Sequence, residues 1–207
     1  MNMEPMNREP GINDEPTRPI NRPPSHAVPA PSPVNITALL VAAAVAIVVS
    51  VGIGVYGRLH EATFFAFSIA GFSSGTAAKT WLATVAFLLA VVQLVTAMVM
   101  FRGSSPAPSW IGPLHRWSGR AAVLVTVPVA VHCLYALGFQ PGEPRTLIHS
   151  LFGCFFYGAF VAKMLLLTRK GTPGWTFPLF GGAVFTALTA LWLTSAVWFF
   201  ATTGITF

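Results

Sequence analysis

The sequence predicts an all-α integral membrane protein, a bundle of five transmembrane helices preceded by a disordered, proline-rich N-terminal tail. Hydrophobic residues make up 54% of the 207 residues and charged residues only 9%, far below the roughly 25% charged residues of soluble domains. Five apolar stretches approach the length of about 20 residues that a helix needs to cross a bilayer. None of these stretches contains Asp or Glu.

The predicted tail comprises residues 1–35. It holds nine of the seventeen prolines and no aromatic residue, so it cannot bury enough apolar surface to offset the entropy lost on ordering. The first apolar run begins only near Ile36, which does not fit a secretory signal, and we expect the tail to be retained. Its proline-rich pieces are either a plain solvated leader or a polyproline ligand.

The five predicted spans are helices, because no segment alternates apolar and polar residues with the period of two that barrel strands require. Their only interior cations, Arg120 and Lys163, lie within about two turns of a span end, where long side chains reach the headgroups. The segment 59–80 is apolar but interrupted by Gly and Ser, and it is predicted to be interfacial or re-entrant. The spans are predicted at 36–56, 81–101, 118–139, 147–168 and 178–201.

The distribution of Lys and Arg predicts the orientation. With five spans, nine of the twelve cations fall on one side of the membrane, and Arg58, Lys79 and Arg145 fall on the other. By the positive-inside rule the side with nine cations is cytoplasmic. The sequence therefore predicts a multi-pass protein of the plasma (inner) membrane, with a cytoplasmic N-terminus and an outer C-terminus.

The composition excludes several classes of protein. Only Glu61 and Glu143 follow residue 15, which excludes paired-carboxylate catalysis. Cys133 and Cys154 are too few for a disulfide framework or a cysteine-rich zinc module, and they are either free or bonded to each other. Single cations scattered between apolar stretches do not form a nucleic-acid interface. Membrane lipids are the expected partners.

His132 and His149 are the candidate iron ligands. Both fall in the outer half of the predicted bundle, His132 about 10 Å below the boundary at 1.5 Å per residue. The short connection 140–145, rich in Pro and Gly, predicts that the third and fourth spans are antiparallel neighbours. Two imidazoles from different helices at similar depth are what a bis-histidine haem b requires. The alternative is that both rings only hydrogen-bond to neighbouring helices.

Other residues complete this candidate site. Gly138 and Gly153 would leave room for a flat ring, although adjacent helices only about 8–10 Å apart must splay to admit one. His60, beside Glu61 on the predicted outer side, is a reserve ligand for either histidine or a solvated interfacial residue.

A family resemblance is carried by residues 114–153. The pattern Leu114-His115-x-Trp117-x-Gly119, then an apolar helix, then His149-Ser-Leu-Phe-Gly153 resembles the third and fourth helices of cytochrome b-561 and ferric-reductase-like membrane haem proteins. The resemblance implies two haems, with His115 binding an inner one and His149 an outer one.

The sequence departs from that family, because the second and fifth predicted spans contain no histidine. An inner haem would thus lack its second imidazole, and one outer haem bound by His132 and His149 is the remaining expectation, with His115 then a headgroup or helix-start residue. The chain also resembles uncharacterised five-span bacterial membrane families.

The predicted function is that of a membrane-embedded b-type haem protein. It would transfer electrons between a membrane oxidoreductase or the quinone pool and an extracytoplasmic redox partner. The alternative is a cofactor-free accessory or assembly subunit of a larger membrane complex. A transporter is less favoured, because the spans lack the buried charges and broken helices of transport pathways.

Overall fold

A computed structural model describes residues 34–64, 71–102 and 106–207 of the chain. Within these ranges the chain is helical and contains no strand. The predicted tail, up to residue 33, lies outside the described residues, as do residues 65–70 of the segment predicted to be interfacial. The helices are α1 (Ile36–Leu59), α2 (Gly75–Phe101), α3 (Ile111–Val131), α4 (Pro144–Leu167), α5 (Thr176–Trp192) and α6 (Trp198–Thr203).

Two π-helical segments are continuous with these α-helices. Segment η1 (His132–Leu137) continues α3, and η2 (Leu193–Val197) joins α5 to α6. With these joined, five helices of the described chain are long and apolar enough to cross a membrane. The prediction of an all-α, five-span membrane protein is confirmed, and its outer surfaces contact lipid.

The helix starts differ from the predicted boundaries because local capping sets them. The helix α2 begins at Gly75 rather than at residue 81, since the Ser74 hydroxyl accepts a hydrogen bond from the Ala77 amide at 3.0 Å. A serine cap satisfies one of the free amides of a first turn. The start of α1 matches the prediction, and there Asn35 caps Ala38 at 2.9 Å.

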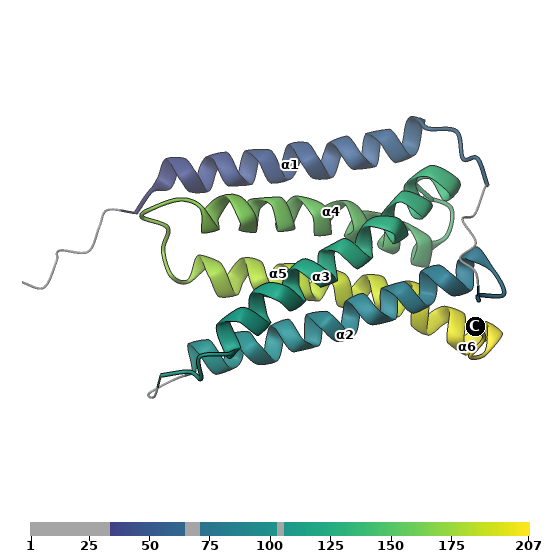
Figure 1. Cartoon of the computed structure of the whole chain (residues 1–207). Helices are drawn as coiled ribbons and strands as arrows, with labels where there is room; N and C mark the ends of the chain where they lie inside the picture. Colours follow the sequence, from purple (N-terminus) through teal and green to yellow (C-terminus); the bar gives the residue numbers. More distant parts are fainter. Residues whose placement is uncertain (1–33, 65–70, 103–105) are drawn as a thin grey trace, which may run out of the picture. The chain divides into compact units, whose positions relative to one another are not determined.

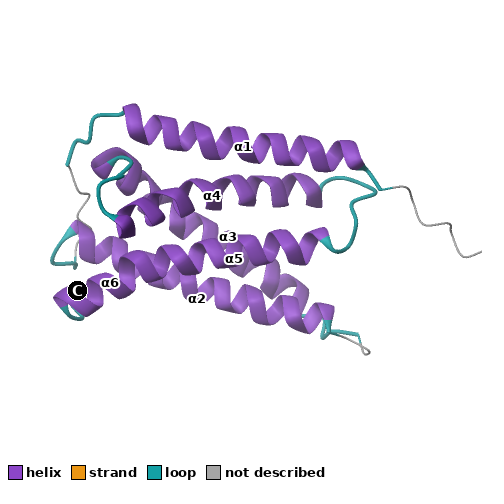
Figure 2. Ribbon diagram, turned by 180° about the vertical axis from the view of Figure 1, so that it is seen from behind, coloured by secondary structure: helices purple, strands orange, loops and turns teal. Residues whose placement is uncertain are grey.

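The helices pack in the order α1, α4, α5, α2, α3, as Figures 1 and 2 show. The helix α1 lies along α4, and α3 lies along α2. The prediction that the third and fourth spans are neighbours is wrong as a statement about backbone packing, since α3 packs along α2 and α4 packs along α1 and α5. Tyr157 of α4 reaches Thr126 of α3 only by its side chain. The short loop between them joins only their ends and does not hold their lengths together.

Small residues explain which helices pair. A Cβ atom added at Gly158 of α4 would lie 2.5 Å from the Ala46 carbonyl oxygen of α1, so only glycine permits this approach. On the other pair, a Cβ atom at Gly119 of α3 would lie 2.8 Å from Oε1 of Gln93 in α2. The Gln93 amide donates to the Ser118 hydroxyl at 2.7 Å and to the His115 carbonyl.

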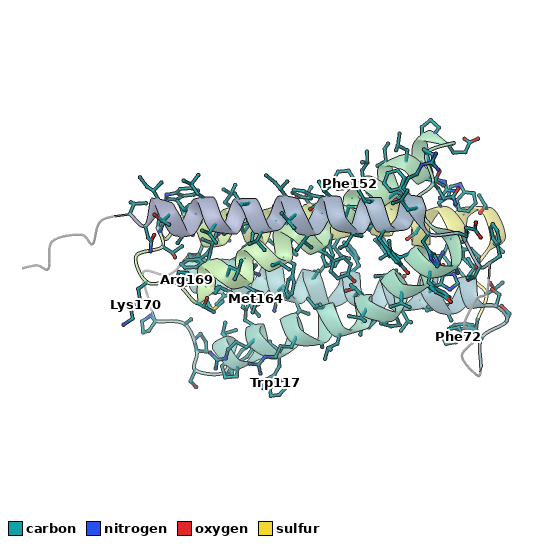
Figure 3. The ribbon with its side chains drawn as sticks, turned by 90° about the horizontal axis from the view of Figure 1, so that it is seen from above. Phe72, Trp117, Phe152, Met164, Arg169 and Lys170 are labelled. Carbon is teal, nitrogen blue, oxygen red and sulfur yellow. The ribbon has the colours of Figure 1, made fainter. Side chains whose placement is uncertain are left out.

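The bundle has two ends that matter for the site. The last turns of α1 and η1 lie together with the first turns of α2 and α4, and we name this the His149 end. The first turn of α3 and the last turns of α2 form part of the opposite end, named the His115 end. Figure 3 shows Arg169 and Lys170 at the latter end and Phe72 at the former.

Candidate functional site

A cavity of about 260 Å³ lies at the His149 end. Residues of α2, of α3 with η1, of α4, and of α5 with η2 and α6 line it, and most of their side chains are apolar. The cavity separates α3 from α4. At its deep end the Tyr157 hydroxyl donates to the carbonyl and the hydroxyl of Thr126, at 3.2 and 3.1 Å. The cavity thus opens a space between these helices, closed on one side by the Tyr157–Thr126 hydrogen bonds.

His149 lines the cavity from α4, and a threonine fixes its tautomer. The Nδ1 atom lies 3.0 Å from the Thr194 hydroxyl oxygen. The single proton of that hydroxyl is already donated to the Ala190 carbonyl, at 2.7 Å. Thr194 must therefore accept, and the hydrogen-bond pattern assigns the ring proton to Nδ1. The Nε2 atom keeps its lone pair, which is the state that binds a metal.

Arg145 holds the threonine in place. Its Nη1 atom donates to the Thr194 carbonyl at 2.7 Å, and its guanidinium carbon lies 3.8 Å from the centre of the Trp198 ring. Thr194 lies within η2, and π-helical turns occur often at functional sites. The other π-helical segment, η1, borders the same cavity, and it follows Pro128, which cannot donate to the helical ladder.

His132 does not line this cavity. Its side chain is 6% exposed in η1, and the neighbouring residue Cys133 lines the cavity instead. The structure does not bring the two predicted imidazole ligands, His132 and His149, to one cavity.

The two predicted glycines do line it. A Cβ atom at Gly153 would meet only Cδ2 of Leu191, at 3.8 Å, so the glycine adds open space beside His149. Gly138 has a φ of +69° and turns the chain after η1, where a Cβ atom would lie 3.0 Å from the Gly57 carbonyl oxygen. Its conformation and this contact both favour glycine.

His60 lies outside the cavity lining, at the end of α1. Its ring stacks between the rings of Tyr56 and Tyr135, with centroid distances of 5.2 and 4.9 Å. Its Nε2 atom lies 3.2 Å from the Tyr135 carbonyl oxygen, which can only accept, so Nε2 carries the proton. The ring joins α1 to η1 and is not placed beside His149 as a reserve ligand.

His115 repeats the arrangement of His149 at the opposite end. Its Nδ1 atom lies 2.8 Å from the Thr96 hydroxyl oxygen, and that hydroxyl donates to the Val92 carbonyl at 2.7 Å. The Thr96 hydroxyl therefore accepts from the ring, and the ring proton of His115 is assigned to Nδ1. His115 does not line the cavity at the His149 end, and its ring lies in the contact between α2 and α3.

The comparison with protein-family models identifies the family. The family of unknown function DUF6529 matches residues 38–207. The chain belongs to this family. The DUF6529 match includes every helix from α1 to α6, and hence the whole cavity. No curated protein and no solved structure matches the chain. The resemblance to cytochrome b-561 stays a prediction.

Metal-ligating side chains are sparse in this family member. Among the described residues, no group of three or more His, Cys, Asp and Glu side chains could hold a metal ion. Cys133 and Cys154 are both free and both line the cavity. Thr194 and Lys79 also line the cavity, and no pattern in the sequence marks either of them as a site residue.

Proposed function

We propose that the chain is a membrane-embedded b-type haem protein that transfers electrons, and that the cavity at the His149 end is its haem site. The observation that carries the proposal is that His149 lines an apolar cavity between separated helices with the proton on Nδ1. Its Nε2 lone pair is then available as an axial ligand. When bound, haem b supplies one-electron reduction and oxidation at its iron.

The residues of the chain fit such a group in three respects. The lining is mostly apolar, which suits a porphyrin and excludes water. Gly153 leaves open space next to His149. Two cations, Lys79 and Arg145, line the cavity close to the first turns of α2 and α4, where acidic groups of a bound ligand would find opposite charge.

The proposal assigns one imidazole of the cavity to the haem rather than two. His132 does not line the cavity, and His115 lies in another helix contact at the opposite end. Thr194 and Arg145 are positioning residues, because Thr194 orients the His149 ring and Arg145 holds the Thr194 carbonyl.

The predicted orientation indicates which redox partners to expect. In the orientation that the positive-inside rule predicts from the sequence, the His149 end would lie at the outer face of the plasma membrane. A haem there would exchange electrons with a membrane oxidoreductase or the quinone pool on one side and an extracytoplasmic partner on the other.

A cofactor-free accessory subunit is the second candidate, and one observation favours it. The rings of His60, His115 and His149 each contact another helical segment by a hydrogen bond or by stacking. Such interactions stabilise helix packing in a membrane without any cofactor.

The test is the haem content of the purified full chain in a mild detergent. We expect one haem per chain, a Soret band, and a reduced-minus-oxidised difference spectrum. His149→Ala is expected to abolish the colour. The matched control His115→Ala removes a histidine with the same kind of threonine contact that does not line this cavity, and it is expected to keep the haem. A folded, colourless protein that takes up no added haem contradicts the proposal and favours the accessory subunit.

A further inference from the structure

Lys79 contributes a positive charge to the lining of the cavity. It lies in the second turn of α2, is half-buried, and lines the cavity. It makes no hydrogen bond or ion pair to any residue that the structure describes. Its charge is close enough to interact with His132, Cys133 and His149, so it lies among the polar groups at this end of the cavity.

The residues that the structure describes offer no acid to this lysine. The lining contains Lys79 and Arg145 and no Asp or Glu. The two acids among the described residues, Glu61 and Glu143, are exposed and do not line the cavity. The Arg145 guanidinium is already engaged by the Thr194 carbonyl and the Trp198 ring. An ionisable side chain within a membrane helix usually marks a ligand or ion site unless the protein pairs it.

We infer that the ligand of this cavity carries a carboxylate that Lys79 binds, with the apolar body of the ligand between α3 and α4. The inference rests on the proposed function in that it uses the same cavity and deepens the account of what the cavity recognises. Haem b, with two propionate carboxylates, is one source of this chemistry. A long-chain fatty acid is another.

The chemistry explains why a lysine is suited to this position. An ammonium group is a compact charge with three donors on a flexible stem, so it can follow a carboxylate that enters from the membrane boundary. A hydrogen bond between charged groups contributes enough to change affinity by about 10- to 100-fold. The surrounding apolar lining reduces the competition from water.

The experiment compares acids with their esters on the full chain in lipid nanodiscs. Iron protoporphyrin IX and its dimethyl ester are titrated by Soret absorbance. Spin-labelled stearic acid and its methyl ester are followed by the immobilised fraction of the electron paramagnetic resonance spectrum. We expect the wild type to prefer the acid of at least one pair by about tenfold or more. Lys79→Gln is expected to remove most of that preference, and Lys79→Arg to keep it.

The matched control is Arg58→Gln. Arg58 is an exposed cation in the last turn of α1, at the same end of the bundle, and it does not line the cavity. Its loss lowers the surface charge of the His149 end by the same amount. The control is expected to keep the preference for the acid, which separates binding by Lys79 from a general electrostatic attraction.

The outcomes separate this inference from the haem proposal. Haem binding with no preference for the acid in either pair, or a preference that survives in Lys79→Gln, overturns the inference and leaves the haem proposal standing. Binding of stearic acid but not of haem, with a preference that depends on Lys79, supports the inference and overturns the haem proposal. No binding of any of the four compounds overturns both.

Discussion

Two histidines at opposite ends of the bundle have the same hydrogen-bond partner and different surroundings. His149 and His115 each have Nδ1 beside a threonine hydroxyl whose proton goes to the carbonyl four residues earlier. His149 lines a cavity of about 260 Å³, whereas His115 lies in the packed contact of α2 and α3. In both cases the threonine fixes the tautomer of the histidine. The space beside the ring then decides whether the free nitrogen can bind a ligand.

The largest effect is expected from filling that space. Gly153→Phe places a ring inside the cavity beside His149, and we expect haem uptake to be lost, because a filled cavity cannot also admit the porphyrin. The readout is haem per chain after purification. Gly52→Phe is the matched control, since a Cβ atom at Gly52 meets nothing within 4 Å. Normal haem content in Gly153→Phe contradicts the assignment of the cavity.

The threonine substitutions distinguish the two ends. Thr194→Val removes the acceptor that orients His149, and we expect haem affinity to fall by about 10- to 100-fold, as for other groups that orient a ligand. Thr96→Val removes the equivalent group beside His115 and is expected to leave haem affinity unchanged. Absorbance titration with haem measures both. Equal effects of the two substitutions on haem affinity would show that His149 and His115 do not differ in their role in haem binding.

The contact between α2 and α3 is expected to influence stability alone. Gln93→Leu removes the donor to Ser118 and to the His115 carbonyl. Interhelical hydrogen bonds in membranes contribute about 0.6 kcal/mol on average and about 1.7 kcal/mol at most, so the free energy of unfolding should fall within that range. Thermal unfolding in detergent measures the change. A loss of haem in a folded Gln93→Leu protein would mean that the His115 end also holds a ligand.

The smallest effect is expected at His60. His60→Phe keeps an aromatic ring between Tyr56 and Tyr135 and removes one exposed hydrogen bond. The free energy of unfolding should change by no more than about 0.5 kcal/mol, and haem content should not change. Loss of haem in this variant would make His60 a ligand after all.

The sequence predicted the spans because their signal is local. Apolar length and the absence of acids are properties of each stretch alone. The pairing of spans was less predictable, since the loop between the third and fourth spans restricts only the helix ends. Gly158 permits the close approach of α4 to the backbone of α1, and a glycine in a membrane helix does not show in the sequence which helix it meets.

The site was predictable in part for the same reason. His149 and Gly153 were identified from the sequence and line the cavity. His132 was placed by depth, which does not specify the direction of its side chain around the helix. Thr194 gave no signal, because threonines in membrane helices commonly bond to the preceding turn, and Lys79 was assigned to the connection before the second span.

The most direct test of the central claim is chemical rescue of His149→Gly. The claim is that the His149 ring supplies the nitrogen that binds the iron in the cavity. The account predicts that this variant folds and purifies colourless, and that haem added together with imidazole, but not haem alone, restores the Soret band of the wild type because imidazole occupies the vacated space. A variant that keeps its haem spectrum without imidazole, or that stays colourless with it while the wild type is coloured, would contradict the account.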